Sequence, residues 1–129
     1  MTRSIAALFP LPGVRTRLEL GSDGFGQVQL QADGRICGRF ALGGDDDVLA
    51  IDILCIDEAE RGYGLGTEAA QLLRDGAAAG GWAVLRAWAP PDRGLAVYFW
   101  SRMGLHPLFG ERPGGGIWFE RELRRLQAN

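Results

Sequence analysis

Residues 61–66 combine an arginine with three alternating glycines at a point where the hydrophobic pattern changes its period. The segment reads Arg61-Gly62-Tyr63-Gly64-Leu65-Gly66, and an amphipathic pattern of helical period begins at its end. Glycine allows a positive φ and lets an anion approach backbone N–H groups without obstruction by a Cβ atom. The N–H groups and the positive dipole end of a following helix would face the same anion. The segment therefore predicts a pyrophosphate site, to which Arg61 could add a charge-assisted hydrogen bond.

One carboxylate lies in an otherwise apolar run a few residues upstream. Asp52 interrupts residues 48–56, which we expect to form a central strand covered on both faces. Burial disfavours the charged form of a carboxylate, so Asp52 is a candidate general base that takes a proton from an ammonium group. A structural alternative is that Asp52 pairs with an arginine on a neighbouring strand. The sole histidine, His106, precedes a proline beyond the last helical pattern, and we expect it at the surface.

The elements that would position these residues follow from the hydrophobic period and the turn residues. Alternating patterns separated by turns rich in glycine and aspartate predict an antiparallel meander before the central strand. Amphipathic patterns of helical period predict two helices, each ended by glycine. The predicted fold class is α+β, with a mixed, mainly antiparallel sheet and two main helices. In chain order the sequence predicts a short helix or an extended lead-in, without a sheet strand, at 1–14, strands at 18–20, 28–30, 36–40 and 48–56, a helix at 66–79, a strand at 82–89, a helix at 93–103, and strands at 105–109 and 117–123.

The composition limits the number of domains and the kinds of partner. With 129 residues, of which 47% are hydrophobic, the chain suits one domain with its own core. No apolar run approaches the roughly 20 residues that span a bilayer, so we expect no membrane segment. A net charge of −2 does not favour nucleic acid as a partner. Cys37 and Cys55 lack the neighbouring ligands of a zinc site, so we expect no metal, and two reduced thiols in a cytoplasmic protein.

The glycine segment resembles the acetyl-CoA loop of the GNAT N-acetyltransferase superfamily. That loop reads Arg or Gln, two residues, Gly, one residue, then Gly or Ala, and Arg61, Gly64 and Gly66 occupy the specified positions. Residues 96–105 resemble the family's second segment, with an Ala-rich helix start, an aromatic pair and then a glycine followed by an apolar residue. The resemblance covers residues 48–123 and implies a single GNAT-like acetyl-CoA-binding domain over residues 1–129.

The resemblance implies which residues would hold acetyl-CoA. In the family a splayed strand offers backbone groups to the pantetheine arm, and a backbone N–H polarises the thioester carbonyl. By position, Ile56 would supply that N–H, and Arg93 stands where many relatives have an asparagine near the cofactor. The residues implied in cofactor binding are Leu54, Cys55, Ile56, Arg61, Gly62, Tyr63, Gly64, Leu65, Gly66, Thr67, Arg93 and Trp100.

Two departures from the family pattern concern the chemistry beside the cofactor. Trp100 stands where the family often has a tyrosine that protonates the leaving thiolate, and an indole N–H has no proton to give at physiological pH. Tyr98 lies about 200° away around the same helix and is a poor substitute. Relatives also insert two helices between their first strands, for which the predicted hairpins leave no room. We therefore expect an acceptor site that is shallow, built from the hairpins, or completed by a second subunit in a homodimer.

These residues favour direct transfer of acetyl from acetyl-CoA to an unidentified primary amine in a ternary complex. A second hypothesis is a non-catalytic acetyl-CoA-binding regulatory module, because Trp100 replaces the family's acid. A third is a dinucleotide-binding protein, since residues 64–69 also satisfy G-x-G-x-x-A and Asp92 could meet a ribose. The predicted antiparallel meander and the small number of β-α repeats argue against the third hypothesis.

Overall fold

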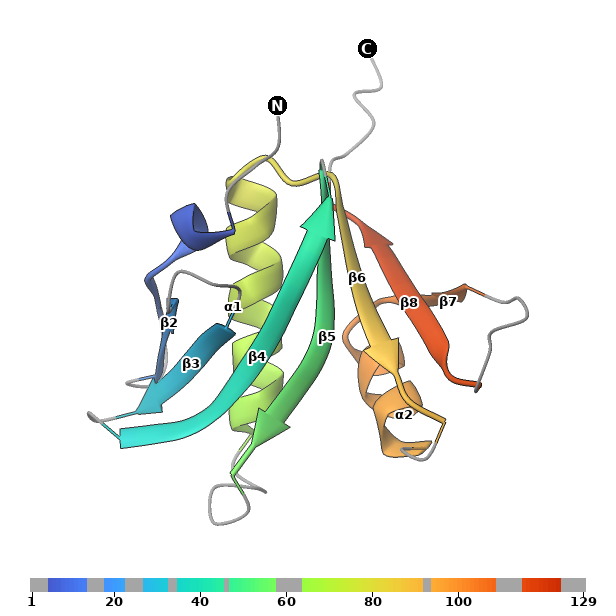
Figure 1. Cartoon of the computed structure of the whole chain (residues 1–129), viewed down its shortest axis with the longest axis horizontal. Helices are drawn as coiled ribbons and strands as arrows, with labels where there is room; N and C mark the ends of the chain where they lie inside the picture. The colour runs from blue at the N-terminus through green and yellow to red at the C-terminus, as the bar shows by residue number, and fades with distance from the viewer. Residues whose placement is uncertain are drawn as a thin grey trace.

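The computed structural model describes residues 5–13, 18–22, 27–32, 35–45, 47–57, 64–91, 94–108 and 115–123. Within these ranges the strands form one eight-stranded sheet in the order β1-β2-β3-β4-β5-β6-β8-β7. The helices α1 and α2 lie against the same face of this sheet (Figure 1). The elements are a 3-10 turn at Ala6–Leu8, the strands β1 (Leu11–Pro12), β2 (Leu18–Ser22), β3 (Gln27–Ala32), β4 (Arg35–Asp45), β5 (Val48–Ile56), β6 (Val84–Ala89), β7 (His106–Leu108) and β8 (Ile117–Glu122), and the helices α1 (Leu65–Ala79) and α2 (Gly94–Arg102).

The sheet is mixed and mainly antiparallel, which confirms the predicted fold class. Strands β1 to β5 pair as an antiparallel meander, β5 and β6 pair in parallel, and β6, β8 and β7 pair antiparallel. Right-handed crossovers from β5 to β6 and from β6 to β7 place both helices on one face. The prediction of no sheet strand in residues 1–14 is wrong. Leu11 and Pro12 pair with Leu20 and Glu19 at the edge of the sheet, which is the position where a strand tolerates proline.

The core lies between the sheet and the two helices. Because side chains alternate across a strand, each strand directs every second side chain toward the helices. Helix α1 buries Ala69, Leu73 and Ala77, which form one stripe along its length. Leu11 of β1 lies against Gly76 of α1, where a Cβ atom would come within 2.8 Å of the leucine side chain. The strand residues buried in this core include Leu18, Leu20, Val28, Leu30, Phe40, Leu42, Leu49, Ile51, Leu85, Ala87, Ala89 and Phe119.

Both helices end in a turn that satisfies their last carbonyl groups. After α1, the N–H of Trp82 donates to the carbonyl of Ala77 at 3.0 Å. After α2, the N–H of Leu105 donates to the carbonyl of Trp100 at 3.1 Å. Such bonds, between residues five apart in sequence, are typical of a helix stopped by glycine, and they return the chain to the sheet. Within the described ranges, neither helix combines the length and the apolar character that a membrane crossing requires.

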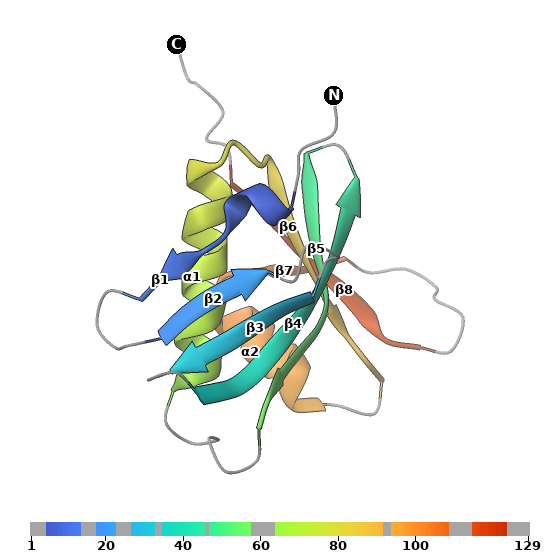
Figure 2. The same ribbon diagram turned by 60° about the vertical axis from the view of Figure 1, so that its left-hand side comes forward.

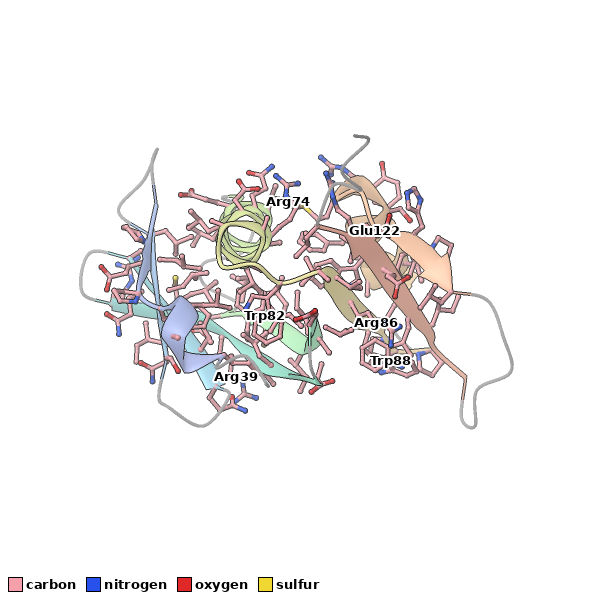
Figure 3. All side chains as sticks on the ribbon, turned by 90° about the horizontal axis from the view of Figure 1, so that it is seen from above. Arg39, Arg74, Trp82, Arg86, Trp88 and Glu122 are labelled. Atoms are coloured by element: carbon pink, nitrogen blue, oxygen red, sulfur yellow. The ribbon has the colours of Figure 1, made fainter. Side chains whose placement is uncertain are left out.

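The opposite face of the sheet has neither helix against it. Seen from above, Arg39 of β4 and Arg86 and Trp88 of β6 point away from α1 (Figure 3). We call this surface the helix-free face. It includes Gln27 and Gln29 of β3, Arg39 and Ala41 of β4, Asp52, Ile53 and Cys55 of β5, Arg86 and Trp88 of β6, and Trp118 and Glu120 of β8.

Candidate functional site

The parallel strands β5 and β6 pair at their beginnings and then separate. Their ladder joins residues 48–51 to residues 84–87 and stops there, although β5 continues to Ile56 and β6 to Ala89. Figure 1 shows the two strands diverging toward the start of α1. The cause lies in the pairing of β5 with β4. Leu42 opposes Ile51 but Ala41 opposes Ile53, so that Asp52 is the extra residue of a β-bulge in β5. A bulge bends its strand, which takes β5 away from β6.

The bulge also decides which backbone groups of β5 face the opened side. The N–H of Asp57 donates to the carbonyl of Cys37 at 2.9 Å, which makes these two residues a hydrogen-bonded pair. Because such pairs alternate along an antiparallel ladder, Cys55 directs its backbone groups to β4. Leu54 and Ile56 direct theirs to the side from which β6 has diverged. The resemblance implied all three residues as backbone contacts of a pantetheine arm, and for Cys55 the alternation contradicts this.

Helix α1 begins beside the open edge of β5. Its N-cap is Gly64, with a φ of 75°, and no side chain caps this end. A Cβ atom added to Gly64 would meet nothing within 4 Å, whereas one added to Gly66 would lie 3.5 Å from Cγ1 of Ile56 and 3.9 Å from Cε1 of Phe99. The start of α1, the end of β5 and α2 therefore meet at one place. An anion at the N–H groups of α1 would lie next to the open edge of β5.

Other residues implied in cofactor binding are placed only in part. Leu65 and Thr67 lie in the first turn of α1, and their contacts with a cofactor stay predictions. Arg61, Gly62, Tyr63 and Arg93 lie outside the described residues, and so does Asp92, so their contacts stay predictions.

Asp52 is exposed, and the expectation that it is buried is wrong. The bulge is the reason, because it leaves both Asp52 and Ile53 on the helix-free face instead of turning one of them into the core. The Oδ2 atom of Asp52 lies 3.4 Å from the position of a Cβ atom on Gly43 of β4. Within the described part of the chain its carboxylate makes no hydrogen bond or ion pair, so it does not pair with an arginine there. Its role as a base stays a prediction.

Trp100 belongs to the core. Its side chain is 4% exposed, and its ring meets the ring of Phe99 edge-on, with centroids 4.8 Å apart. Tyr98 is 64% exposed and lies on the other side of α2, where its ring contacts the guanidinium of Arg102 at 5.8 Å. The prediction that Tyr98 faces away from Trp100 is confirmed. Because an indole donates no proton, the described part of α2 supplies no acid in the position of the family's tyrosine.

Two cross-strand pairs on the helix-free face were missed by the sequence analysis. Trp88 of β6 and Trp118 of β8 have ring centroids 5.2 Å apart, with their planes inclined by 54°. Beside them, Nε of Arg86 lies 2.8 Å from Oε1 of Glu120. The alternation of residues 84–89, with alanine and leucine at one parity and arginine and tryptophan at the other, is the signal that could have placed Arg86 and Trp88 on one exposed face.

The remaining titratable candidates are separate from one another. Cys37 is buried, Cys55 is partly buried, and both are free thiols. His106 is exposed at the start of β7, as predicted. Among the described residues, no three side chains of histidine, cysteine, aspartate or glutamate gather closely enough to hold a metal ion.

No protein-family model and no curated protein matches the sequence. Solved structures do resemble the fold. The ribosomal-protein-S18-alanine N-acetyltransferase from Escherichia coli superimposes with a TM-score of 0.69 at 16% identity, over 84% of this chain and 75% of that one. An acetyltransferase of the GNAT family from Streptococcus pneumoniae gives 0.65 at 14% identity, over 74% and 65% of the two chains. N-acetylglutamate synthase from Neisseria gonorrhoeae, solved with coenzyme A and N-acetyl-glutamate, gives 0.63 at 19% identity, over 78% of this chain and 26% of that one.

These likenesses show that the chain has the GNAT N-acetyltransferase fold. A doubly wound dinucleotide fold would need several adjacent parallel strands, whereas β5 and β6 are the only neighbouring parallel pair among the described strands. The dinucleotide hypothesis therefore loses its structural basis.

Proposed function

We propose that this protein is an acetyl-CoA-dependent N-acetyltransferase that passes the acetyl group directly to a primary amine in a ternary complex. The observation that carries the proposal is the meeting of two features. The backbone groups of Leu54 point to the side where β6 has diverged, and the uncapped start of α1 at Gly64 lies beside the end of β5. An extended pantetheine arm would pair with the strand edge, and a pyrophosphate would bind the helix N-terminus.

The residues of the chain would divide the chemistry as follows. A backbone N–H at the end of β5, near Ile56, would polarise the thioester carbonyl. The amine nitrogen would then attack the carbonyl carbon, and the C–S bond would break with its electron pair leaving on sulfur. Thiols have an ordinary pKa of about 8.5, so a thiolate can leave at neutral pH and take its proton from solvent without a tyrosine. Before the attack, Asp52 or water would take one proton from the ammonium group to give the neutral amine, and the nitrogen would lose a second proton to solvent as the amide forms.

A second candidate is a non-catalytic acetyl-CoA-binding module. The burial of Trp100 favours it, because the position that often supplies the acid is occupied by a core side chain. The two free thiols suit a reducing compartment, so we propose a cytoplasmic location for either activity.

Binding and turnover together separate these candidates. We expect calorimetry to detect acetyl-CoA binding, and we expect free thiol to be released when a panel of primary amines is added to protein and acetyl-CoA. Binding without thiol release from any amine or peptide would favour the regulatory module. No binding of acetyl-CoA or CoA would overturn both.

A further inference from the structure

The helix-free face meets the point where β5 and β6 separate. Ile51 and Ala87 are the last paired residues of the two strands, and both are buried under the helices. Each is followed by a residue on the other side of the sheet, Asp52 on β5 and Trp88 on β6. Both helices occupy one face, so a cofactor bound at the start of α1 leaves the other face open. An acceptor would then reach the thioester from the helix-free face, between Asp52 and Trp88.

The aromatic pair on this face is held in place. Trp88 and Trp118 are each partly exposed, with ring centroids 5.2 Å apart. Gly116, with a φ of 87°, lies so close to the Trp88 ring that a Cβ atom there would collide with Cζ2 and Cη2. The backbone at Gly116 on one side and the indole of Trp118 on the other therefore restrict the orientation of the Trp88 ring. Inclined aromatic rings with accessible surface bind apolar carbon skeletons, and they attract cations over their faces.

The charges around the pair favour a cation. Arg86 and Glu120 neutralise each other at 2.8 Å, which leaves Asp52 as a carboxylate with no partner in the described part of the chain. Arg39 pairs with Cys55, which is three residues along β5 from Asp52, about 10 Å of strand. Arg39 and Asp52 form no ion pair in the described part of the chain. Asp52 therefore contributes an unneutralised negative charge to this part of the helix-free face.

From this arrangement we infer that the acceptor is a cationic amine on an apolar skeleton, such as an arylalkylamine or a long alkylamine. Its ammonium group lies toward Asp52, and its carbon skeleton lies on Trp88 and Trp118. Acidic acceptors fit this face poorly, because the carboxylate of Asp52 repels a second negative charge. This inference rests on the proposed function for its catalytic meaning, but the amine site itself is testable without turnover.

The test uses the indole N–H signals of the four tryptophans in NMR spectra of the full chain. Titration with 2-phenylethylamine, with and without CoA, should shift the signals of Trp88 and Trp118. The signals of Trp82 and Trp100, which are 2% and 4% exposed, serve as internal controls. Glutamate, added at the same concentration, should leave all four signals in place. Absence of shifts at Trp88 and Trp118 in both series would overturn the inference.

Turnover supplies the second readout. Trp118→Ala should raise the KM for 2-phenylethylamine about tenfold, with a smaller change in kcat, whereas Trp118→Phe, which keeps an aromatic face, should stay within about threefold of the wild type. Thiol release that is equally fast with glutamate would overturn the inference and leave the acetyltransferase proposal standing. Failure to bind acetyl-CoA would overturn the acetyltransferase proposal and leave standing the amine site, which the NMR titration tests separately. A dimer that dissociates in Trp118→Ala would show instead that a second copy covers this face.

Discussion

Asp52 links the opening of the sheet to the chemistry beside it. As the extra residue of the bulge between β4 and β5, it bends β5 away from β6, and its own side chain is left on the helix-free face. Its carboxylate has no partner in the described part of the chain and lies next to the diverging strands. One irregularity in the ladder thus places a carboxylate where an amine would approach the thioester.

Replacing Asp52 by asparagine should lower kcat/KM for the amine without affecting the cofactor. The expected loss is at least tenfold, because the variant loses an attractive charge and a proton acceptor. Acetyl-CoA affinity by calorimetry should stay the same. Since Asp52 is exposed and unpaired, the free energy of unfolding should change by less than about 0.5 kcal/mol. Glu19→Gln, which removes an exposed carboxylate from β2, is the matched control. Equal kinetics for both variants would remove Asp52 from the mechanism.

Two substitutions of Gly64 distinguish the effect of backbone strain on CoA binding from the effect of a negative charge. At a φ of 75°, any side chain costs about 1 to 2 kcal/mol of stability, but its Cβ atom would meet open space. We expect Gly64→Ala to weaken CoA binding modestly and Gly64→Glu to weaken it at least tenfold further, because a carboxylate would replace the bound anion at the helix start. Calorimetry on both folded variants measures the difference. Equal affinities would show that the pyrophosphate does not bind at this helix end.

At the scale of elements, local patterns in the sequence were sufficient for the helices and most strands. The predicted helices 66–79 and 93–103 correspond to Leu65–Ala79 and Gly94–Arg102, because capping residues and helical period are read from neighbouring positions. The bulge could not be predicted in this way. Residues 48–56 are apolar at almost every position, so no alternation reveals that the buried face passes from Ile51 to Leu54 and leaves Ile53 48% exposed. That shift depends on the register with which β5 pairs with the preceding strand β4, and an apolar run does not reveal that register.

The position of α2 against the sheet depends partly on a cap supplied by β8. Nη1 of Arg121 donates to the carbonyl of Met103, just past the end of α2, at 3.5 Å. A cation near a helix C-terminus contributes about 0.3 to 1 kcal/mol. Arg121→Ala should therefore lower the free energy of unfolding by up to about 1 kcal/mol in urea titrations. Arg102→Ala removes a basic residue from the last turn that is exposed, and should cost less. A larger loss for Arg102→Ala would contradict this assignment.

The whole molecule has two unequal faces. All described α-helices lie on one side of the sheet, and the other side carries glutamines, the Arg86–Glu120 ion pair and the Trp88–Trp118 pair (Figure 2, Figure 3). The part of the sheet that ends at β5 and the part that begins at β6 pair over only four residues on each strand. A ligand bound between β5 and β6 would therefore contact both parts. The fold thus gives the cofactor and the acceptor separate sides, and the divergence of β5 and β6 is where they meet.

Backbone amide spectra recorded with and without CoA test this account most directly. CoA should shift the amide signals of Leu54, Ile56 and Gly66, which lie on the open edge of β5 and in the first turn of α1. The signals of Leu20 and Leu30 in the paired strands β2 and β3 should not move, and they serve as the reference. Shifts confined to β2 and β3, or none at Leu54 and Gly66 at saturating CoA, would contradict a cofactor site between β5 and β6.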